Sequence, residues 1–368
     1  MNPEKKRHQI YEKAFGKEWI SSEEAVFLYE SAPLAELMQA AYQFRQLLIP
    51  GKEVSWIIDR NINYTNVCIT RCRFCNFSCP PGSEKAYITS VAVYRKKIEE
   101  LFALGGDQLL LQGGIHPDWK LEDYVRLFTN LKKEFPGLKL HALGPHEVHY
   151  MAVKSGLSYR ETLEILHKSG LDSLPGAGAE ILSDRVRSLI SPAKCTSEEW
   201  LEVMRQAHLM NLVTSATMMF GHLETLGERF LHLEKIRSLQ AERPKHHTGF
   251  ISFTPWPFRG KDTVLYKRYG VTDSVSIEEY VRMIALSRLM LTNIPNIQAS
   301  WLTVGKTAGQ LCLHGGANDM GSIMIEENVV SSAGGLQTTL DTESMKNMIR
   351  EAGFIPVRRN QYYDLIQD

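Results

Sequence analysis

Short runs of aliphatic and β-branched residues alternate along this chain with longer stretches of helical periodicity. The short runs end at polar or glycine residues, and the longer stretches place apolar residues on one face of a helix. Such alternation predicts repeated β-α units around a parallel sheet. The eight predicted strands fall near residues 61–67, 107–112, 138–143, 170–175, 213–219, 248–253, 297–301 and 317–323.

Longer helical patterns separate several of these strands, for example over residues 120–134, 197–210, 225–242 and 277–293. The units recur at intervals of about 30–45 residues, which suits a (β/α)8 barrel. No linker rich in Pro, Ser or Gly interrupts the alternation. The sequence therefore predicts an α/β fold with one TIM-type (β/α)8 barrel rather than two separate domains.

Both ends of the chain are expected to add helices to this barrel. Ser21-Ser22-Glu23-Glu24 is a helix start signal, and the predicted N-terminal helices cover residues 3–16, 21–30 and 33–47. The expected organisation is an N-terminal helical extension over residues 1–50, a barrel core over 51–340, and a C-terminal helix and tail packing on the barrel over 341–368.

Composition and charge narrow the functional classes. The chain has 368 residues, 43% of them hydrophobic, and its 42 Lys and Arg balance 42 Asp and Glu. With zero net charge, the chain has no overall positive potential that would attract nucleic acid or an anionic membrane surface. No apolar stretch approaches the ~18 residues of a membrane-spanning helix, and the first 18 residues are too charged for a secretory signal. We therefore expect a cytoplasmic protein with no nucleic-acid partner and no membrane insertion.

Four of the six cysteines crowd into residues 68–79. Cys68, Cys72 and Cys75 follow the first predicted strand directly, and loops after strand carboxyl ends form the active-site face of a parallel barrel. Zinc sites usually add a second cysteine pair or histidines, but Cys195 and Cys312 stand alone. Three thiolates suit a cubane iron–sulfur cluster with one iron left open for a substrate.

Two alternatives to that cluster stay open. One is a structural zinc site or a set of buried cysteines, which would make the chain a non-catalytic metal-binding protein. The other concerns Cys79, which could replace one of the three ligands but lies past the expected loop. We expect Cys79 to be a free thiol.

The spacing C-x3-C-x-aromatic-C, with Phe74 in the aromatic position, resembles the signature of the radical S-adenosylmethionine (SAM) superfamily. The resemblance implies a [4Fe-4S] cluster held by Cys68, Cys72 and Cys75, with SAM bound to its open iron and Phe74 beside SAM. One electron from the cluster then cleaves SAM and gives a 5′-deoxyadenosyl radical. The protein must hold that radical against one hydrogen atom of the substrate.

Two further segments are candidates for binding SAM. Gln112-Gly113-Gly114 follows the second predicted strand, and paired glycines let a backbone approach a ligand closely. The pair could equally form a simple turn, but the resemblance implies a role beside SAM. Glu180 follows the fourth predicted strand and could bind the SAM ribose, as acidic residues do in similar enzymes, or could be an acid at a helix N-terminus.

Other residues near the predicted strand ends could serve catalysis or the substrate. His116 and His141 are candidates for the proton acceptor, because imidazole titrates near neutrality. The segment Phe253-Thr-Pro-Trp256-Pro-Phe258 could form a rigid wall against an aromatic substrate. Single histidines are often structural, and the aromatic segment could instead be packed in the core.

Several segments together resemble the dehypoxanthine futalosine cyclases of the futalosine route to menaquinone, from about residue 55 to 360. They are NINYTNVC, QGGIHP, SLPGAGAEIL, DRVRSLISPAKC, SATMMFGH, FTPWPF, NIQASW and GANDMGSIMIEENVV. The resemblance implies that the adenosyl radical removes the C4′ hydrogen of dehypoxanthine futalosine, and that the carbon radical attacks the benzoate ring. Loss of one electron and one proton then gives cyclic dehypoxanthinyl futalosine.

Two relatives of these cyclases share the cluster loop and stay as alternatives. Aminofutalosine synthase of the same pathway adds the adenosyl radical to an enolpyruvyl benzoate, and deazaflavin-cofactor synthases form a third group. The segments 252–258 and 190–192 match the cyclase pattern better. Ferredoxin or flavodoxin is the expected electron donor.

Overall fold

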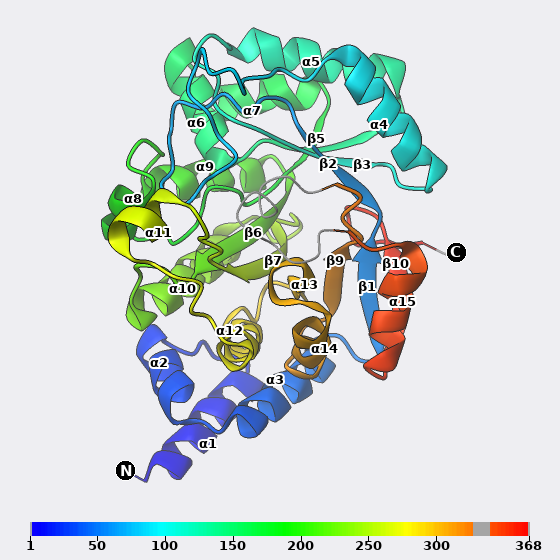
Figure 1. Ribbon diagram of the computed structural model, residues 1–368. Coiled ribbons are helices and arrows are strands. Elements are labelled where there is room, and N and C mark those ends of the chain that lie inside the picture. Colours follow the sequence, from blue (N-terminus) through cyan, green and yellow to red (C-terminus); the bar gives the residue numbers. More distant parts are fainter. Residues whose placement is uncertain (1, 327–338, 367–368) are drawn as a thin grey trace.

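The computed structural model describes residues 2–326 and 339–366. Its main sheet has seven strands in sequential order, every neighbouring pair parallel (Figure 1). The strands are β2 (Asp59–Asn63), β3 (Gln108–Gln112), β4 (Lys139–Ala142), β5 (Leu171–Leu174), β6 (Val213–Phe220), β7 (Phe250–Pro257) and β8 (Asn296–Ile297). Each overlaps a strand predicted from the sequence, although β2 begins two residues earlier and ends sooner, and β8 shares only Ile297 with the predicted strand 297–301.

A second sheet completes the circuit. Its order is β11-β10-β1-β9, comprising β1 (Glu53–Ile57), β9 (Asp319–Ser322), β10 (Ile355–Arg359) and the antiparallel β11 (Leu365–Ile366). The chain passes from β1 into β2 through Ile58, and a single bridge joins Gln298, next to β8, to Asp319 of β9. Eight parallel strands, β2 to β9, thus surround one interior, which confirms the predicted TIM-like α/β fold.

Helices surround these strands on the outside (Figure 1). Three of them start at capping boxes, in which Ser158, Thr196 or Thr225 exchanges hydrogen bonds with a Glu three residues later. The helices after β2 are α4 (Val91–Ala103), α5 (Leu121–Glu134), α6 (Pro145–Ser155), α7 (Tyr159–Lys168), α8 (Asp184–Ile190), α9 (Ser197–Leu209), α10 (Leu226–Glu242), α11 (Val264–Tyr269), α12 (Ile277–Met290), α13 (Trp301–Val304), α14 (Lys306–His314) and α15 (Thr342–Glu351).

The three predicted N-terminal helices are present and lie together at one end of the molecule (Figure 1). They are α1 (Pro3–Phe15), α2 (Ser22–Ser31) and α3 (Leu34–Leu48). Helices α2 and α3 pack mainly on α10, α12 and α14, and α1 packs on α2 and α3. The buried guanidinium of Arg237 on α10 ties the two layers, because it donates to the carbonyl of Ile20 at 2.9 Å.

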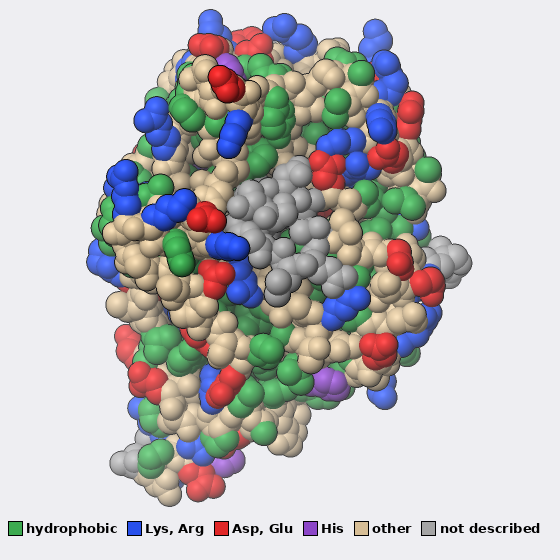
Figure 2. Space-filling model, in the orientation of Figure 1, with side chains coloured by type: hydrophobic (Ala, Val, Ile, Leu, Met, Phe, Trp, Pro, Cys, Tyr) green, Lys and Arg blue, Asp and Glu red, His purple; other side chains and the backbone are tan. Residues whose placement is uncertain are grey.

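The surface visible in Figure 2 intersperses basic and acidic side chains with apolar ones, as the balanced composition predicts. Within residues 2–326 and 339–366, no helix is both long enough and apolar enough to cross a bilayer.

Polar side chains line the barrel interior. Successive strand residues point to opposite faces, and on β3 Leu109 and Leu111 are fully buried in the apolar core whereas Leu110 and Gln112 on the other face keep partial exposure. His141 on β4 bonds Ser173 on β5 through Nδ1 at 2.7 Å. Interiors of such barrels are usually filled by bulky branched residues, so a polar interior is a departure that suits a polar ligand.

Candidate active site

The loop after β2 carries the three predicted cluster ligands. All three thiols are free; Cys68 and Cys72 are buried and Cys75 is more exposed. The Sγ of Cys68 lies 2.9 Å from the hydroxyl of Thr70 and accepts the backbone N–H of Ile115 at 3.4 Å. Such contacts to a ligating sulfur stabilise the thiolate and tune the reduction potential of an iron–sulfur cluster.

The donor set fits a cluster. Within the described part of the chain, no three His, Cys, Asp or Glu side chains gather closely enough to hold one metal ion, whereas in a cubane each thiolate binds a different iron. Burial raises the pKa of Cys72 to about 11, against the opposing effects of Lys194 and Thr70. Metal coordination removes this obstacle, because a coordinating thiol is deprotonated. Cys68, Cys72 and Cys75 are therefore the residues that would hold a [4Fe-4S] cluster.

The end of β3 packs tightly on this loop. A Cβ at Gly114 would lie 2.2 Å from the carbonyl oxygen of Val67, and one at Gly113 would lie 2.7 Å from the ring of Tyr64. The N–H of Tyr64 donates to the Gln112 carbonyl at 3.2 Å. The glycine pair is thus required first by contact with the cysteine loop itself, and its role beside SAM stays a prediction.

Cys79 anchors the other side of the loop through its backbone. Its N–H donates to the Asn66 carbonyl at 2.9 Å, and its carbonyl accepts the N–H of Cys68 at 3.0 Å. These backbone hydrogen bonds are enough to explain why Cys79 is buried, and they do not require its sulfur to bind a metal. That Cys79 is not a cluster ligand stays a prediction.

Glu180 lies in the loop after β5, paired with a residue that the sequence did not single out. Its carboxylate is 2.6 Å from the ammonium of Lys194, and each side chain is only 7% exposed. Lys194 also lies 5.2 Å over the ring of Phe74. Burial disfavours the ionised carboxylate, but Lys194, with smaller contributions from Arg187 and His222, more than offsets this effect, so the pKa of Glu180 is lowered. The only sequence signal for Lys194 is its place in the segment SPAKC.

One buried arginine holds this arrangement together. The guanidinium of Arg187 on α8 donates to the carbonyls of Gly178 at 2.9 Å, Ala179 at 2.7 Å and Cys195 at 2.9 Å. The turn before Glu180 and the turn after Lys194 are therefore fixed by the same side chain. Glu180 itself has a φ of +45°, a conformation that favours glycine.

Tyr64 and Glu147 form a second buried pair that sequence analysis missed. The Tyr64 hydroxyl donates to Oε1 of Glu147, which lies on α6 just after β4. Burial raises the pKa of Glu147 to about 8. Tyr64 is also stacked on Trp119, with ring centroids 5.4 Å apart. The pair ties the start of the cysteine loop to the neighbouring loop.

The two predicted histidines lie in different places. His116 follows β3, where its Nδ1 accepts the N–H of Asp118 at 3.2 Å. His141 lies inside the barrel, and burial, assisted by the positive charge of Arg359, lowers its pKa to about 3. A catalytic role for either histidine stays a prediction.

The aromatic segment on β7 divides between two faces. Phe253 is fully buried, with its ring centroid 6.4 Å from that of His232 on α10, and Phe258 is buried 6.1 Å from His222. Trp256 keeps partial exposure. Trp256 is thus the partly exposed ring of the three, and contact of this segment with a substrate stays a prediction.

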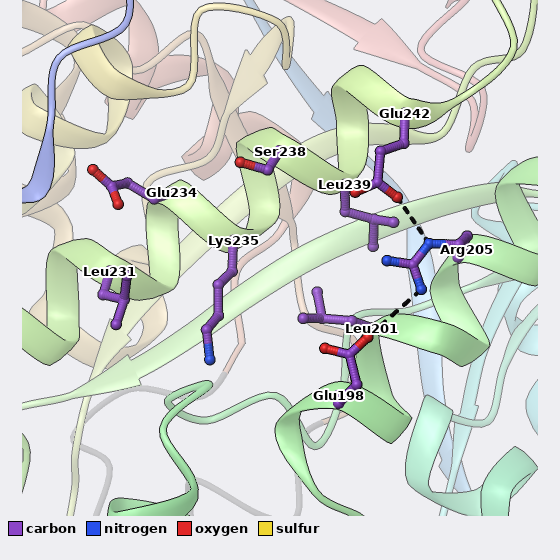
Figure 3. A pocket seen from close by; sticks show the side chains of 9 residues that line it. All are labelled: Glu198, Leu201, Arg205, Leu231, Glu234, Lys235, Ser238, Leu239 and Glu242. Carbon is purple, nitrogen blue, oxygen red and sulfur yellow. Dashed lines mark hydrogen bonds and ion pairs between the residues drawn. The ribbon is translucent and has the colours of Figure 1, made fainter.

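A shallow hollow lies elsewhere, on the outer layer between α9 and α10. Figure 3 shows Arg205 of α9 reaching Glu242 of α10, an ion pair of 2.8 Å. None of the residues predicted for the site lines this hollow, so it has no part in the site described above.

Comparison with known proteins gives matches along nearly the whole chain. The model of the radical SAM superfamily matches residues 62–236, and that of the CofH/MqnC C-terminal region matches residues 247–368. A protein of Halalkalibacterium halodurans named cyclic dehypoxanthine futalosine synthase is 41% identical over 97% of this chain and 94% of its own. A Streptomyces coelicolor protein of the same name is 43% identical over 94% and 85%.

A third relative has a different name. It is the 5-amino-6-(D-ribitylamino)uracil–L-tyrosine 4-hydroxyphenyl transferase of Methanopyrus kandleri, 37% identical over 90% of this chain and 89% of its own. Among solved structures, methylornithine synthase (PylB) has a TM-score of 0.73 at 18% identity and covers 95% of this chain and 97% of its own. That likeness concerns the fold alone.

The cysteine loop, the barrel and these matches make the chain a radical SAM enzyme, which uses a [4Fe-4S] cluster and SAM. Within the superfamily it belongs to the family that has the CofH/MqnC C-terminal region and includes the cyclic dehypoxanthine futalosine synthases.

Proposed function

We propose that this enzyme converts dehypoxanthine futalosine to cyclic dehypoxanthinyl futalosine in menaquinone biosynthesis. The observation that carries the proposal is 41% and 43% identity, over nearly the whole chain, to two proteins named for that product. The polar barrel interior supports it, because the substrate carries ribose hydroxyls and a carboxylate as well as an aromatic ring.

The residues near the cysteine loop would hold the cofactors. Cys68, Cys72 and Cys75 bind the cluster, and Phe74 with Gln112, Gly113 and Gly114 lies beside SAM. Glu180, kept ionised by Lys194, accepts hydrogen bonds from the SAM ribose. When bound, the cofactors supply a 5′-deoxyadenosyl radical that takes one hydrogen atom from the substrate.

The barrel interior would hold the substrate still during ring closure. Trp256 offers an apolar surface to the benzoate ring, and His141 offers a neutral hydrogen-bonding group. The lowered pKa of His141 makes it a weak proton acceptor. His116 and His141 stay the two candidates for accepting the proton that leaves the ring.

The test is mass spectrometry of anaerobic reaction mixtures that contain the reconstituted enzyme, dithionite, SAM and dehypoxanthine futalosine. The proposal predicts 5′-deoxyadenosine and a product two hydrogen atoms lighter than the substrate. Parallel reactions offer enolpyruvyl benzoate, for aminofutalosine synthase, and ribitylaminouracil with tyrosine, for the named transferase. A product only in one of these parallel reactions would replace the proposal by that activity.

A further inference from the structure

We propose that the surface formed by the cysteine loop and α11 is the docking site for an acidic one-electron carrier protein. We call this surface the α11 face, and it comprises residues 71–85 and 259–273. One electron leaves the carrier and is taken up by the oxidised cluster, and no covalent bond forms or breaks. The inference concerns delivery of that electron and does not depend on which substrate is cyclised.

Direct contacts make α11 part of the cover over the cysteine loop. The N–H of Leu265 donates to the Arg73 carbonyl at 2.9 Å, and the Asn76 side chain donates to the Lys261 carbonyl at 2.8 Å. Cys75, between Arg73 and Asn76, is the most exposed of the three cluster ligands. The rate of electron transfer falls steeply with distance. A carrier bound to this surface would contact the loop that holds the cluster, which favours fast transfer.

The α11 face is basic although the chain as a whole is neutral. Its two segments contain seven Lys and Arg residues and three acidic ones, against a net charge of zero for all 368 residues. The exposed cations for which the described residues show no ion pair are Arg71, Lys85, Lys261 and Arg268. The acids present are Glu84, Asp262, which lies 3.4 Å from Lys267, and Asp273, which lies 3.8 Å from Arg259. Lys and Arg side chains gather over the position of α11 (Figures 1 and 2).

Exposed apolar and aromatic side chains lie among these charges. Tyr266 and Tyr269 are each 44% exposed and Val264 is 42% exposed, all on one short helix. Aromatic residues and arginine are enriched in protein interfaces. Electron-transfer complexes are small and transient, and complementary charge raises their association rate. An acidic carrier fits this combination.

The charge-reversal variant Lys261→Glu/Arg268→Glu tests the docking site. Neither side chain bonds to the cysteine loop or lies in the proposed binding machinery. The matched control, Lys133→Glu/Lys168→Glu, makes the same charge change at exposed positions in the last turns of α5 and α7. Those helices run back toward the amino ends of the strands, so the control changes the opposite end of the barrel.

Two measurements compare these proteins with the wild type. Stopped-flow spectroscopy follows reduction of the loaded cluster by reduced flavodoxin without any substrate, and calorimetry measures binding of flavodoxin to the purified enzymes. At low ionic strength we expect flavodoxin to reduce the cluster of the variant at least tenfold more slowly, and to bind the variant at least tenfold more weakly. Both differences should shrink in high salt. Reduction by dithionite and the control variant should match the wild type.

Equal rates and affinities for the variant and the wild type would overturn the docking site. An equal loss in the control would also overturn it, since the effect would then come from net charge alone. Because both measurements omit the substrate, they are unaffected if the proposed cyclisation proves wrong.

Discussion

The ammonium group of Lys194 lies 2.6 Å from the carboxylate of Glu180, and both side chains are almost fully buried. The pair joins the loop after β5 to the loop after α8, beside Phe74 and within electrostatic range of Cys72. A buried pair of this kind contributes little net stability, but removal of one partner leaves a charge without compensation. A role of the pair in binding SAM stays a prediction.

Glu180→Gln is expected to weaken SAM binding by roughly 1.5–3 kcal/mol, the range for hydrogen bonds to charged groups. The same change leaves Lys194 buried without its counter-ion, so unfolding must be measured beside affinity. Equilibrium dialysis with SAM and urea unfolding separate the two effects. An unchanged dissociation constant in a folded protein would remove Glu180 from the SAM site.

Gly114→Ala is expected to prevent normal cluster loading. The new methyl group would lie 2.2 Å from the Val67 carbonyl oxygen, so the cysteine loop must shift, at a cost of roughly 1–3 kcal/mol. Gly137→Ala is the matched control, because nothing lies within 4 Å of its added Cβ. Iron content and visible absorption measure loading, and equal iron in both variants would contradict the expectation.

Cys79→Ala should keep the cluster, whereas Ala at Cys68, Cys72 or Cys75 should abolish it. Cys79 contributes to the loop through its backbone bonds to Asn66 and Cys68, which alanine retains. Iron content and colour under anaerobic purification distinguish the four variants. Loss of iron in Cys79→Ala together with its retention in Cys68→Ala would show that the ligand set is wrong.

Glu147→Gln should change how stability depends on pH. The folded pKa of Glu147 is about 8 and its ordinary value is 4.5, so the stability that its neutral form contributes is complete below 4.5 and is lost as pH rises through 8. Glutamine keeps the acceptor for Tyr64 without the charge. The unfolding free energy of the wild type relative to the variant should fall by about 1.4 kcal/mol per unit between pH 5 and 8. Parallel urea curves over this range would contradict a neutral buried Glu147.

Strands such as β3, β6 and β7 could be predicted because each is a short run rich in apolar or β-branched residues with a clear end. The polar β2 was placed only approximately. β1 was missed because it continues almost directly into β2, and the change of partner strands at Ile58 leaves no mark in the sequence. β10 was missed because its partner β1 lies about 300 residues away, with Glu53 opposite Ile355. Local patterns carry no information on such pairing.

The site was predictable to the extent that its chemistry is local in sequence. Three cysteines within eight residues predict a cluster from the sequence alone. Lys194 and Glu147 could not be found in this way, because each pairs with a residue on a different loop. The aromatic segment was easy to recognise, but the sequence does not show which of its rings are buried. Phe253 packs outward, whereas Trp256 stays partly exposed. Sequence motifs thus indicated the strand ends where the cofactors are expected, and the fold identified the buried ion pair and hydrogen-bonded pair beside them.

The most direct test of the central claim is electron paramagnetic resonance of the reduced, anaerobically purified protein, with iron analysis, before and after addition of SAM. The account predicts about four iron ions per chain and a cluster signal that changes when SAM binds, because one iron has no protein ligand. Colourless protein with one zinc ion per chain, or a cluster signal indifferent to SAM, would contradict it.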